Sequence, residues 1–263
     1  MEGTLYAGVD LGTAYIVTAV VDSNGTPVAG ALTRSESSIR DGLILDYTGA
    51  ITLLRRQVDM LLSAGFKIEL SAAGYPPGTT GRNVQAFANV LKAVGLEVVG
   101  LIDEPTAASM VLEITDGAVV DIGGGTTGIS VIRDGNVIYT ADEATGGVHV
   151  DLVLAGHYGI TTNEAEIIKR DPARQADIFA LVRPVFQKMA SIVRHHLRGQ
   201  PVETLYLVGG TCCFPGIKEV MESETGLPVA RPDNPLLVTP LGIALSGLRE
   251  QMNRGEAEGK QRR

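Results

Sequence analysis

The chain has 263 residues, of which 44% are hydrophobic and 20% are charged, and its 22 Lys and Arg against 30 Asp and Glu give a net charge of −8. This length allows one large domain or two lobes with buried cores. The negative charge disfavours binding to nucleic acid, and no apolar run approaches the roughly 20 residues of a membrane-spanning helix. The first residues show no signal-peptide pattern, so we expect a cytoplasmic protein without membrane insertion.

The N-terminal segment "LYAGVDLGTAYIVTAVVDSNG" (5–25) predicts a strand, a tight bend, a returning strand and a turn. Asp10 stands at the end of the first apolar strand, and Gly12 and Thr13 occupy the bend.

Helices and strands alternate through the next 90 residues. Apolar residues recur at helical spacing in 51–62 and 84–94, and 68–76 and 96–103 read as strands. The second of these strands leads to Glu104-Pro105-Thr106, where the proline opens an alanine-rich helix. This alternation indicates an α/β protein.

The segment "AVVDIGGGTTGISVIRDGN" (118–136) contains a glycine-rich stretch in which Gly123, Gly125 and Gly128 satisfy G-x-G-x-x-G. A dinucleotide site needs a helix directly after such glycines, but the β-branched 129–132 predicts a strand. A Walker loop is also excluded because no Gly-Lys-Ser/Thr ends a glycine loop in the chain. We therefore expect a second strand–bend–strand unit.

This unit repeats the N-terminal one. Asp121 ends an apolar strand as Asp10 does, 121 − 10 = 111 residues later. Glycines let backbone N–H groups approach phosphate oxygens, and a carboxylate beside phosphate requires a cation, so both aspartates suit a hydrated Mg²⁺. The alternative is a pair of structural hairpins whose aspartates form Asx turns.

The C-terminal part continues the α/β pattern. A long amphipathic helix is predicted around 178–193, and 204–210 is a buried strand that ends in Gly209 and Gly210. Cys212 and Cys213 are adjacent, lack zinc-ligand spacing and are expected to be reduced thiols. The four histidines also show no metal-ligand spacing.

Seven motifs in this order resemble those of the actin/Hsp70/sugar-kinase ATPase superfamily. They are the phosphate-1 motif at 10–13, "IDEPTAAS" (102–109), the phosphate-2 motif "DIGGGTTG" (121–128), "TGGVHVD" (145–151), "NEAEIIKR" (163–170), the adenosine motif "LYLVGGTCCFPGIKEV" (205–220) and "TPLGIALSG" (239–247). The resemblance implies a two-lobed actin-like ATPase fold with duplicated ribonuclease-H-like lobes and nucleotide in the interlobe cleft.

The same resemblance implies a domain organisation. Residues 1–112 would form lobe I with the first interlobe helix, and 113–238 would form lobe II. The second interlobe helix, 239–250, would return to lobe I, and 251–263 would be a disordered tail because its charges are mixed and it has no apolar face.

The resemblance also implies roles for individual residues, with ATP and Mg²⁺ as ligands. Asp10 and Asp121 would position Mg²⁺ through water, and Glu104 would orient the attacking water. The phosphates would be clamped by Gly12, Thr13, Ala14, Gly123, Gly124, Gly125, Thr126 and Thr127. The adenosine would be contacted by Glu166, Lys169, Gly209, Gly210 and Thr211.

Each of these residues also has a structural interpretation. Glu104 could be a helix-start carboxylate favoured by the helix dipole, and Glu166 and Lys169 could form a solvent-facing i,i+3 ion pair. The two glycines of the adenosine motif could form a plain turn between a strand and a helix. No equivalent of the catalytic lysine of Hsp70 is found between residues 30 and 70, so we expect slow ATP hydrolysis.

At 263 residues, the chain is expected to carry only the ATPase core, without the substrate-binding domain of Hsp70. Among superfamily members it most resembles the ethanolamine-utilisation protein J group, which is chaperonin-like and belongs to operons for bacterial microcompartments. This implies a chaperone-like, slow ATPase whose partners are ATP or ADP and client or microcompartment proteins, with oligomerisation possible. The alternative is an actin-like assembly adaptor or scaffold of the pilus or cell-division type. A sugar kinase is disfavoured because no acceptor-binding insert is found.

Overall fold

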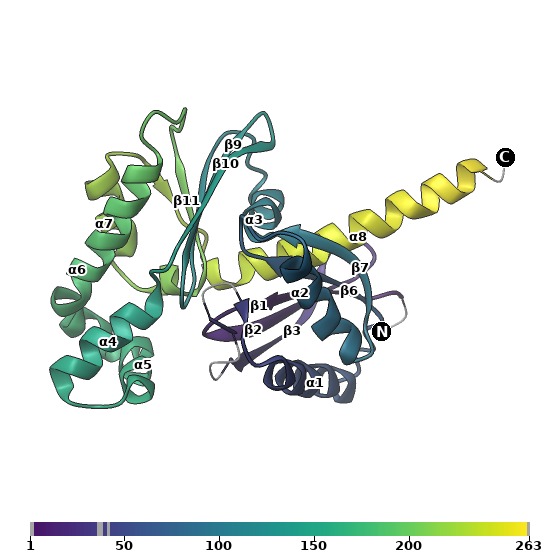
Figure 1. The fold of residues 1–263 in the computed structure, drawn as a ribbon, viewed down its shortest axis with the longest axis horizontal. Coiled ribbons are helices and arrows are strands. Elements are labelled where there is room, and N and C mark those ends of the chain that lie inside the picture. Colours follow the sequence, from purple (N-terminus) through teal and green to yellow (C-terminus); the bar gives the residue numbers. More distant parts are fainter. Residues whose placement is uncertain (1–2, 36–38, 41–42, 262–263) are drawn as a thin grey trace. The chain divides into compact units, whose positions relative to one another are not determined.

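The computed structural model describes residues 3–35, 39–40 and 43–261 of the chain. It divides into two compact units, Met1–Glu113 with Leu237–Arg263 (unit 1) and Ile114–Leu236 (unit 2). Each unit contains one five-stranded mixed sheet with helices packed against it (Figure 1).

The sheet of unit 1 has the strand order β3-β2-β1-β6-β7. Its first three strands are antiparallel neighbours, and β6 and β7 continue in parallel with β1. The strands of this unit are β1 (Tyr6–Leu11), β2 (Tyr15–Val21), β3 (Pro27–Arg34), β6 (Leu70–Tyr75), β7 (Glu97–Asp103) and a small separate ladder of β4 (Ile39–Arg40) with β5 (Leu43–Ile44). Its helices are α1 (Tyr47–Ser63), α2 (Arg82–Ala93), α3 (Glu104–Leu112) and α8 (Pro235–Gln261), which begins two residues before the unit boundary.

Strand alternation gives the sheet of unit 1 two buried faces. Val9 and Ile16 share a core with Leu54 of α1 and Leu91 of α2 on one face. On the other face β1 lies directly against α8, because a Cβ added at Gly8 would stand 2.2 Å from the backbone N of Ala244. A glycine is therefore required where strand and helix touch.

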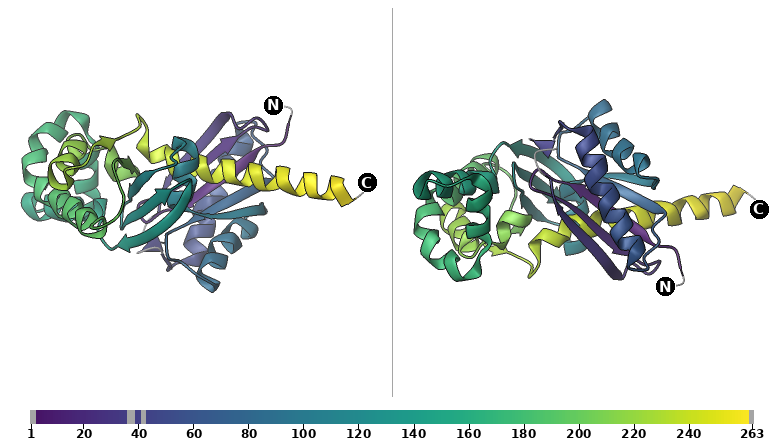
Figure 2. Two further views of the ribbon diagram at one scale, coloured as in Figure 1. Left: turned by 90° about the horizontal axis from the view of Figure 1, so that it is seen from above. Right: turned by 90° about the horizontal axis from the view of Figure 1, so that it is seen from below.

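The end of α8 differs from the sequence-based expectation. The segment expected to be disordered, 251–263, is helical through Gln261, and the last two residues lie outside the described range. A helix whose first part is already docked adds further residues without a new nucleation cost, and most residues of this tail are helix formers such as Gln, Glu and Arg. Arg254 also donates a hydrogen bond to the carbonyl oxygen of Val99, at 3.0 Å. Figure 2 shows α8 (yellow) continuing beyond the sheet of its unit in both views.

The sheet of unit 2 has the order β10-β9-β8-β11-β12, again three antiparallel strands followed by two parallel ones. This repetition of the order in unit 1 confirms the predicted duplicated architecture. The elements are β8 (Gly117–Ile122), β9 (Thr127–Arg133), β10 (Asn136–Glu143), α4 (Gly147–Tyr158), α5 (Thr162–Arg170), α6 (Pro172–His196), β11 (Leu205–Val208), the 3₁₀ turn η1 (Gly210–Cys213), α7 (Ile217–Thr225) and β12 (Val229–Ala230).

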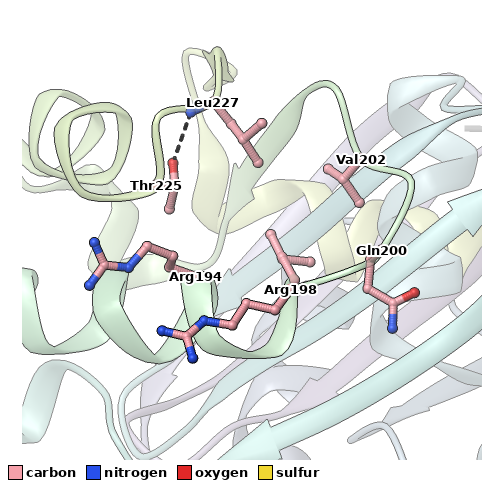
Figure 3. Close-up of a pocket in the computed structure, with 7 residues that line it drawn as sticks. Arg194, Arg198, Gln200, Val202, Thr225 and Leu227 are labelled. Carbon is pink, nitrogen blue, oxygen red and sulfur yellow. Dashed lines mark hydrogen bonds between the residues drawn. The ribbon is translucent and has the colours of Figure 1, made fainter.

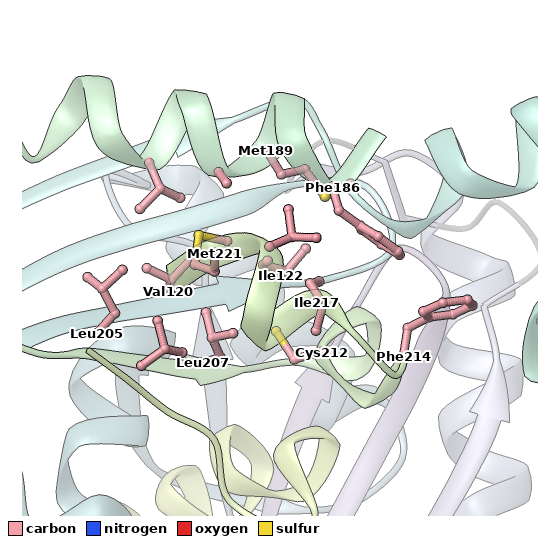
Figure 4. Close-up of a cluster of buried hydrophobic side chains, with 14 of the residues drawn as sticks. Val120, Ile122, Phe186, Met189, Leu205, Leu207, Cys212, Phe214, Ile217 and Met221 are labelled. Carbon is pink, nitrogen blue, oxygen red and sulfur yellow. The ribbon is translucent and has the colours of Figure 1, made fainter. Parts of the chain in front are cut away.

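The core of unit 2 lies between its sheet and helices α6 and α7. Figure 4 shows Phe186 and Met189 of α6 directed at Ile122 of β8, with Ile217 and Met221 of α7 beside them. All five side chains are almost fully buried, as the amphipathic pattern of the long helix predicts.

A polar cluster joins the edge strand β10 to the end of α6. The Tyr139 hydroxyl lies 2.7 Å from Nδ1 of His196, and Nε2 of His196 lies 2.7 Å from the Glu143 carboxylate. A neutral imidazole satisfies both contacts, accepting from the tyrosine and donating to the glutamate. The cluster therefore supplies a specific link at the edge of the sheet, where β10 has no second strand neighbour in the described part of the chain.

Candidate functional site

The bend between β1 and β2 carries the candidate residues of unit 1. The N–H of Gly12 donates to the carbonyl oxygen of Tyr15 at 3.0 Å and closes the bend, and the Ser35 N–H donates to the carbonyl oxygen of Ala14 at 2.9 Å. Asp10 is half-buried and pairs with Val17 one step before the bend. Among the described residues, the N–H of Thr13 donates no hydrogen bond and can serve a ligand.

The bend between β8 and β9 has the same geometry. The N–H of Gly123 donates to the carbonyl oxygen of Thr126 at 3.0 Å, and Asp121 pairs with Gly128 one step before the bend. All four residues stand 111 positions after their counterparts in unit 1. The repeat thus extends from strand order to the hydrogen bond that closes each bend.

The carbonyl side of this second bend is held by neighbouring elements. The carbonyl oxygen of Gly123 accepts from the N–H of Gly147 at 3.0 Å and from Oγ1 of Thr211 at 2.7 Å. The carbonyl oxygen of Gly124 accepts from the N–H of Val148 at 2.8 Å. The first turn of α4 is therefore bonded to the bend.

This arrangement sets the direction of two backbone donors. In a trans peptide the N–H points opposite to the preceding C=O. Because the carbonyls of Gly123 and Gly124 point at α4 and η1, the N–H groups of Gly124 and Gly125 point away from them. Neither N–H donates a hydrogen bond within the described part of the chain, although Gly125 is buried. Successive unpaired N–H groups of this kind form an anion-binding nest, so the residues present fit a phosphate group.

Thr126 and Thr127 differ in burial and in the hydrogen bonds that they make. Thr127 is fully buried, and its hydroxyl donates to the carbonyl oxygen of Thr145 at 2.7 Å, so it holds the neighbouring loop. Thr126 is half-buried, and its carbonyl oxygen closes the bend.

Glu104 is the first residue of α3, immediately after the end of β7. Asp103 caps this helix by accepting from the N–H of Thr106 at 3.0 Å, and Pro105 follows Glu104 in the first turn. Glu104 is half-buried, and a Cβ added at Gly74 of the adjacent strand β6 would lie 3.4 Å from its Cγ. The carboxylate therefore sits at the carboxyl ends of two parallel strands, where α/β folds commonly place reactive groups.

Glu166 and Lys169 on α5 are both shielded from solvent, so the solvent-facing ion pair is wrong. Glu166 is 6% exposed. Nζ of Lys169 lies 2.7 Å from Oδ1 of Asp151 on α4 and donates to the carbonyl oxygen of Gly147 at 3.2 Å. The lysine thus connects α5 to the first turn of α4.

The turn after β11 packs against Asp121. Gly209 has a φ of 92°, and a Cβ there would lie 2.3 Å from Oδ1 of Asp121, so only glycine fits. Gly210 is exposed and begins η1. Burial, and secondarily the nearby carboxylate of Asp121, raises the pKa of the Cys212 thiol well above its usual value, whereas Cys213 is exposed.

Three residues near the second bend received no role from the sequence. Gly146 and Gly147 approach the bend so closely that a Cβ on Gly146 would stand 2.6 Å from the carbonyl oxygen of Gly124. The Asp151 side chain, which is 8% exposed, forms an ion pair with Lys169. The motif "TGGVHVD" contained all three, and its paired glycines were the signal for a close backbone approach.

Unit 2 also has a surface pocket with a volume of about 260 Å³ (Figure 3). It lies between the C-terminal end of α6 and the loop after α7, with Arg194 and Arg198 on one side and Val202 and Leu227 on the other. None of the candidate residues lines it.

The sequence matches two family models, type IV pilus assembly protein PilM over residues 107–235 and MreB/Mbl protein over residues 33–158. Ethanolamine utilization protein EutJ of Escherichia coli K12 is 44% identical over 260 residues, which cover 98% of this chain and 89% of that protein. The crystal structure of EutJ from Carboxydothermus hydrogenoformans superposes with a TM-score of 0.88 at 48% identity, covering 93% of this chain and 90% of the other. The chain belongs to the EutJ family.

More distant structures confirm the fold. MreB 5 of Spiroplasma citri bound to AMPPNP superposes with a TM-score of 0.75 at 18% identity, over 98% of this chain and all of the other. The type IV pilus complex PilM-PilN gives a TM-score of 0.78 at 17% identity, over 94% of this chain and 99% of the other. The predicted actin-like ATPase fold is therefore confirmed for this EutJ family member.

No helix among the described residues has the length and apolar character needed to cross a membrane. No group of three or more His, Cys, Asp or Glu side chains in the described ranges is arranged to hold a metal ion on its own.

Proposed function

We propose that this EutJ family member binds ATP with Mg²⁺, hydrolyses it slowly and serves ethanolamine utilization as a chaperone-like factor for microcompartment proteins. The observation that carries nucleotide binding is the pair of matched bends, with the N–H groups of Gly124 and Gly125 directed away from their supporting helix. The MreB structure with AMPPNP adds support, because a relative of the same fold binds an ATP analogue. The role in ethanolamine utilization is inferred from the name of the EutJ relatives.

In this proposal both bends bind phosphates of the same ATP. Gly12 and Gly123 would shape the two bends, because their N–H groups close them, and backbone groups of Thr13 and Ala14 in unit 1 and of Gly124 to Thr126 in unit 2 would contact the phosphates. When bound, Mg²⁺ would neutralise charge on the transferred phosphoryl group. Asp10 and Asp121 would hold its water ligands, because a carboxylate needs an intervening cation beside phosphate.

Glu104 is proposed to orient the water that attacks the terminal phosphate. A half-buried carboxylate at a helix start can accept a hydrogen bond from water and hold it in place. Glu166 and the turn of Gly209 and Gly210 are proposed to contact the adenosine.

A second candidate function is an assembly adaptor in which nucleotide is only a conformational ligand. The observation that favours it is the match of residues 107–235 to the PilM family model, which covers most of unit 2. In this case protein contacts would carry the function, and turnover of ATP would be absent.

Isothermal titration calorimetry of the purified chain with ATP, with and without Mg²⁺, tests the proposal. We expect Mg²⁺-dependent binding, and loss of at least tenfold in affinity for Asp121→Asn, which removes the charge that the cation requires. Asp116→Asn, outside the bend, is the matched control. Absence of ATP binding by the unaltered chain would reject the proposal, and binding without any phosphate release would favour the adaptor.

A further inference from the structure

Thr211 and Lys169 support the second bend on the side of its carbonyl groups, and both make their contacts without a ligand. We propose that Thr211 and Lys169 are positioning residues, which aim the N–H groups of Gly124 and Gly125 through intervening peptide planes rather than by touching the nucleotide. This inference rests on the proposed nucleotide binding and assigns the two residues a different role from adenosine contact.

The first path runs through Thr211. Its hydroxyl donates to the carbonyl oxygen of Gly123 at 2.7 Å. That carbonyl belongs to the same planar peptide unit as the N–H of Gly124, so fixing one atom fixes the direction of the other. The turn that follows β11 thereby sets a donor in the bend that follows β8.

The second chain of hydrogen bonds starts at Lys169 and passes through one more peptide plane than the first. Its ammonium donates to the carbonyl oxygen of Gly147 at 3.2 Å, and that carbonyl shares a peptide plane with the N–H of Val148. The N–H of Val148 donates to the carbonyl oxygen of Gly124 at 2.8 Å, and this carbonyl shares a plane with the N–H of Gly125. Aligned hydrogen bonds of this kind polarise one another and strengthen the terminal donor.

The surroundings keep both paths fixed. The Lys169 side chain is 17% exposed and lies 2.7 Å from Asp151 of α4, which is 8% exposed, so a shielded ion pair anchors its ammonium. A Cβ on Gly147 would stand 2.6 Å from Oγ1 of Thr211, which shows that the two paths are packed against each other. Glycine at this position is what allows both donors to reach their carbonyls.

Amide hydrogen exchange of the nucleotide-free chain, followed by NMR, tests the paths without any ligand. We expect exchange at Gly147 and Val148 to accelerate about tenfold in Thr211→Val and Lys169→Met. Thr211→Ser keeps the hydroxyl and should restore protection. Thr225→Val removes a comparable hydroxyl bond within α7, and Lys218→Met removes an ammonium from an exposed i,i+4 pair, so both serve as matched controls.

Calorimetry with ATP and with adenosine then separates positioning from contact. Because the bend is proposed to bind the phosphates, Thr211→Val and Lys169→Met should each lower the affinity for ATP about tenfold. The affinity for adenosine should not change. Equal weakening of both ligands would overturn the inference, since it would mean contact with the nucleoside. The double variant Lys169→Met/Asp151→Asn, which leaves no buried uncompensated carboxylate, should show the same selective loss in a chain with near-normal melting temperature.

The two proposals can fail separately. Unchanged exchange at Gly147 and Val148 in both variants overturns the positioning role, whatever the nucleotide results. Accelerated exchange in a chain that binds no ATP supports the peptide-plane paths and rejects the proposed function.

Discussion

At the scale of single residues, the bends show how side chains act through the backbone. Thr127 and Thr211 are both polar residues of nucleotide motifs, yet their hydroxyls donate to the carbonyl oxygens of Thr145 and Gly123. Residue type indicates that a hydroxyl is available, but not whether a neighbouring carbonyl uses it first. In this protein the N–H groups of Gly124 and Gly125 donate no hydrogen bond among the described residues, whereas both threonine hydroxyls are already used.

Glu104 gives a prediction at this scale. Glu104→Gln keeps the shape of the side chain and removes its charge, so ATP affinity should change little while hydrolysis falls by about 100-fold, the usual range for a group that activates water. Phosphate release under saturating ATP is the measurement. Glu113→Gln, at the C-terminal end of the same helix and exposed, is the control. A lower melting temperature with unchanged turnover would instead identify Glu104 as a helix-start carboxylate.

At the scale of elements, the cluster of Tyr139, His196 and Glu143 gives a prediction about stability. His196→Ala removes two hydrogen bonds between β10 and α6, each contributing roughly 0.5–1.5 kcal/mol, so we expect a loss of about 1–3 kcal/mol in the free energy of unfolding. Urea denaturation measures this loss. His195→Ala, its exposed neighbour, should cost much less, and equal losses for both variants would show that the cluster contributes nothing specific.

The elements were largely predictable from the sequence because they depend on local patterns. The apolar stripe around 178–193 predicted most of α6, and the β-branched residues after Gly125 predicted β9 rather than a helix. Partners distant in sequence were not predictable. Lys169 reaches Asp151 only because the 3-residue connection after α4 turns α5 back against it, and no pattern in either helix encodes that pairing.

The same limit applies to α8. Its last turns lack an apolar face, which predicted disorder, but the helix is extended from a docked N-terminal part whose Ala244 and Leu248 are buried. Propensity alone cannot indicate whether such a neighbour exists.

At the scale of the whole molecule, nucleotide binding should raise thermal stability by mass action. At an ATP concentration 100 times the dissociation constant, a ligand that binds only the folded chain adds about 2.7 kcal/mol. For a chain of this length that corresponds to about 5 °C in melting temperature. Differential scanning fluorimetry with Mg²⁺-ATP measures the shift, adenosine should give a smaller one, and no shift with ATP would contradict the proposed function.

The duplication has left the two bends with different support. Both close with the same hydrogen bond, 111 residues apart, and within the described ranges only the second is bonded to a helix start, through Gly147 and Val148. The described contacts of the first bend include one from Ser35, whose buried hydroxyl has no hydrogen-bond partner among the described residues. Identical strand order therefore does not imply that the two bends are equally rigid.

The contact of Gly8 with α8 links that helix to the strand of the first bend. Gly8 lies two residues before Asp10, so the strand that carries the first bend packs directly on the helix backbone at Ala244. From there α8 runs to Gln261, and at about 1.5 Å per residue this arm is about 25 Å long. A rotation of a few degrees about Ala244 would displace the tip by more than an ångström, so a spectroscopic probe placed there would report such a rotation.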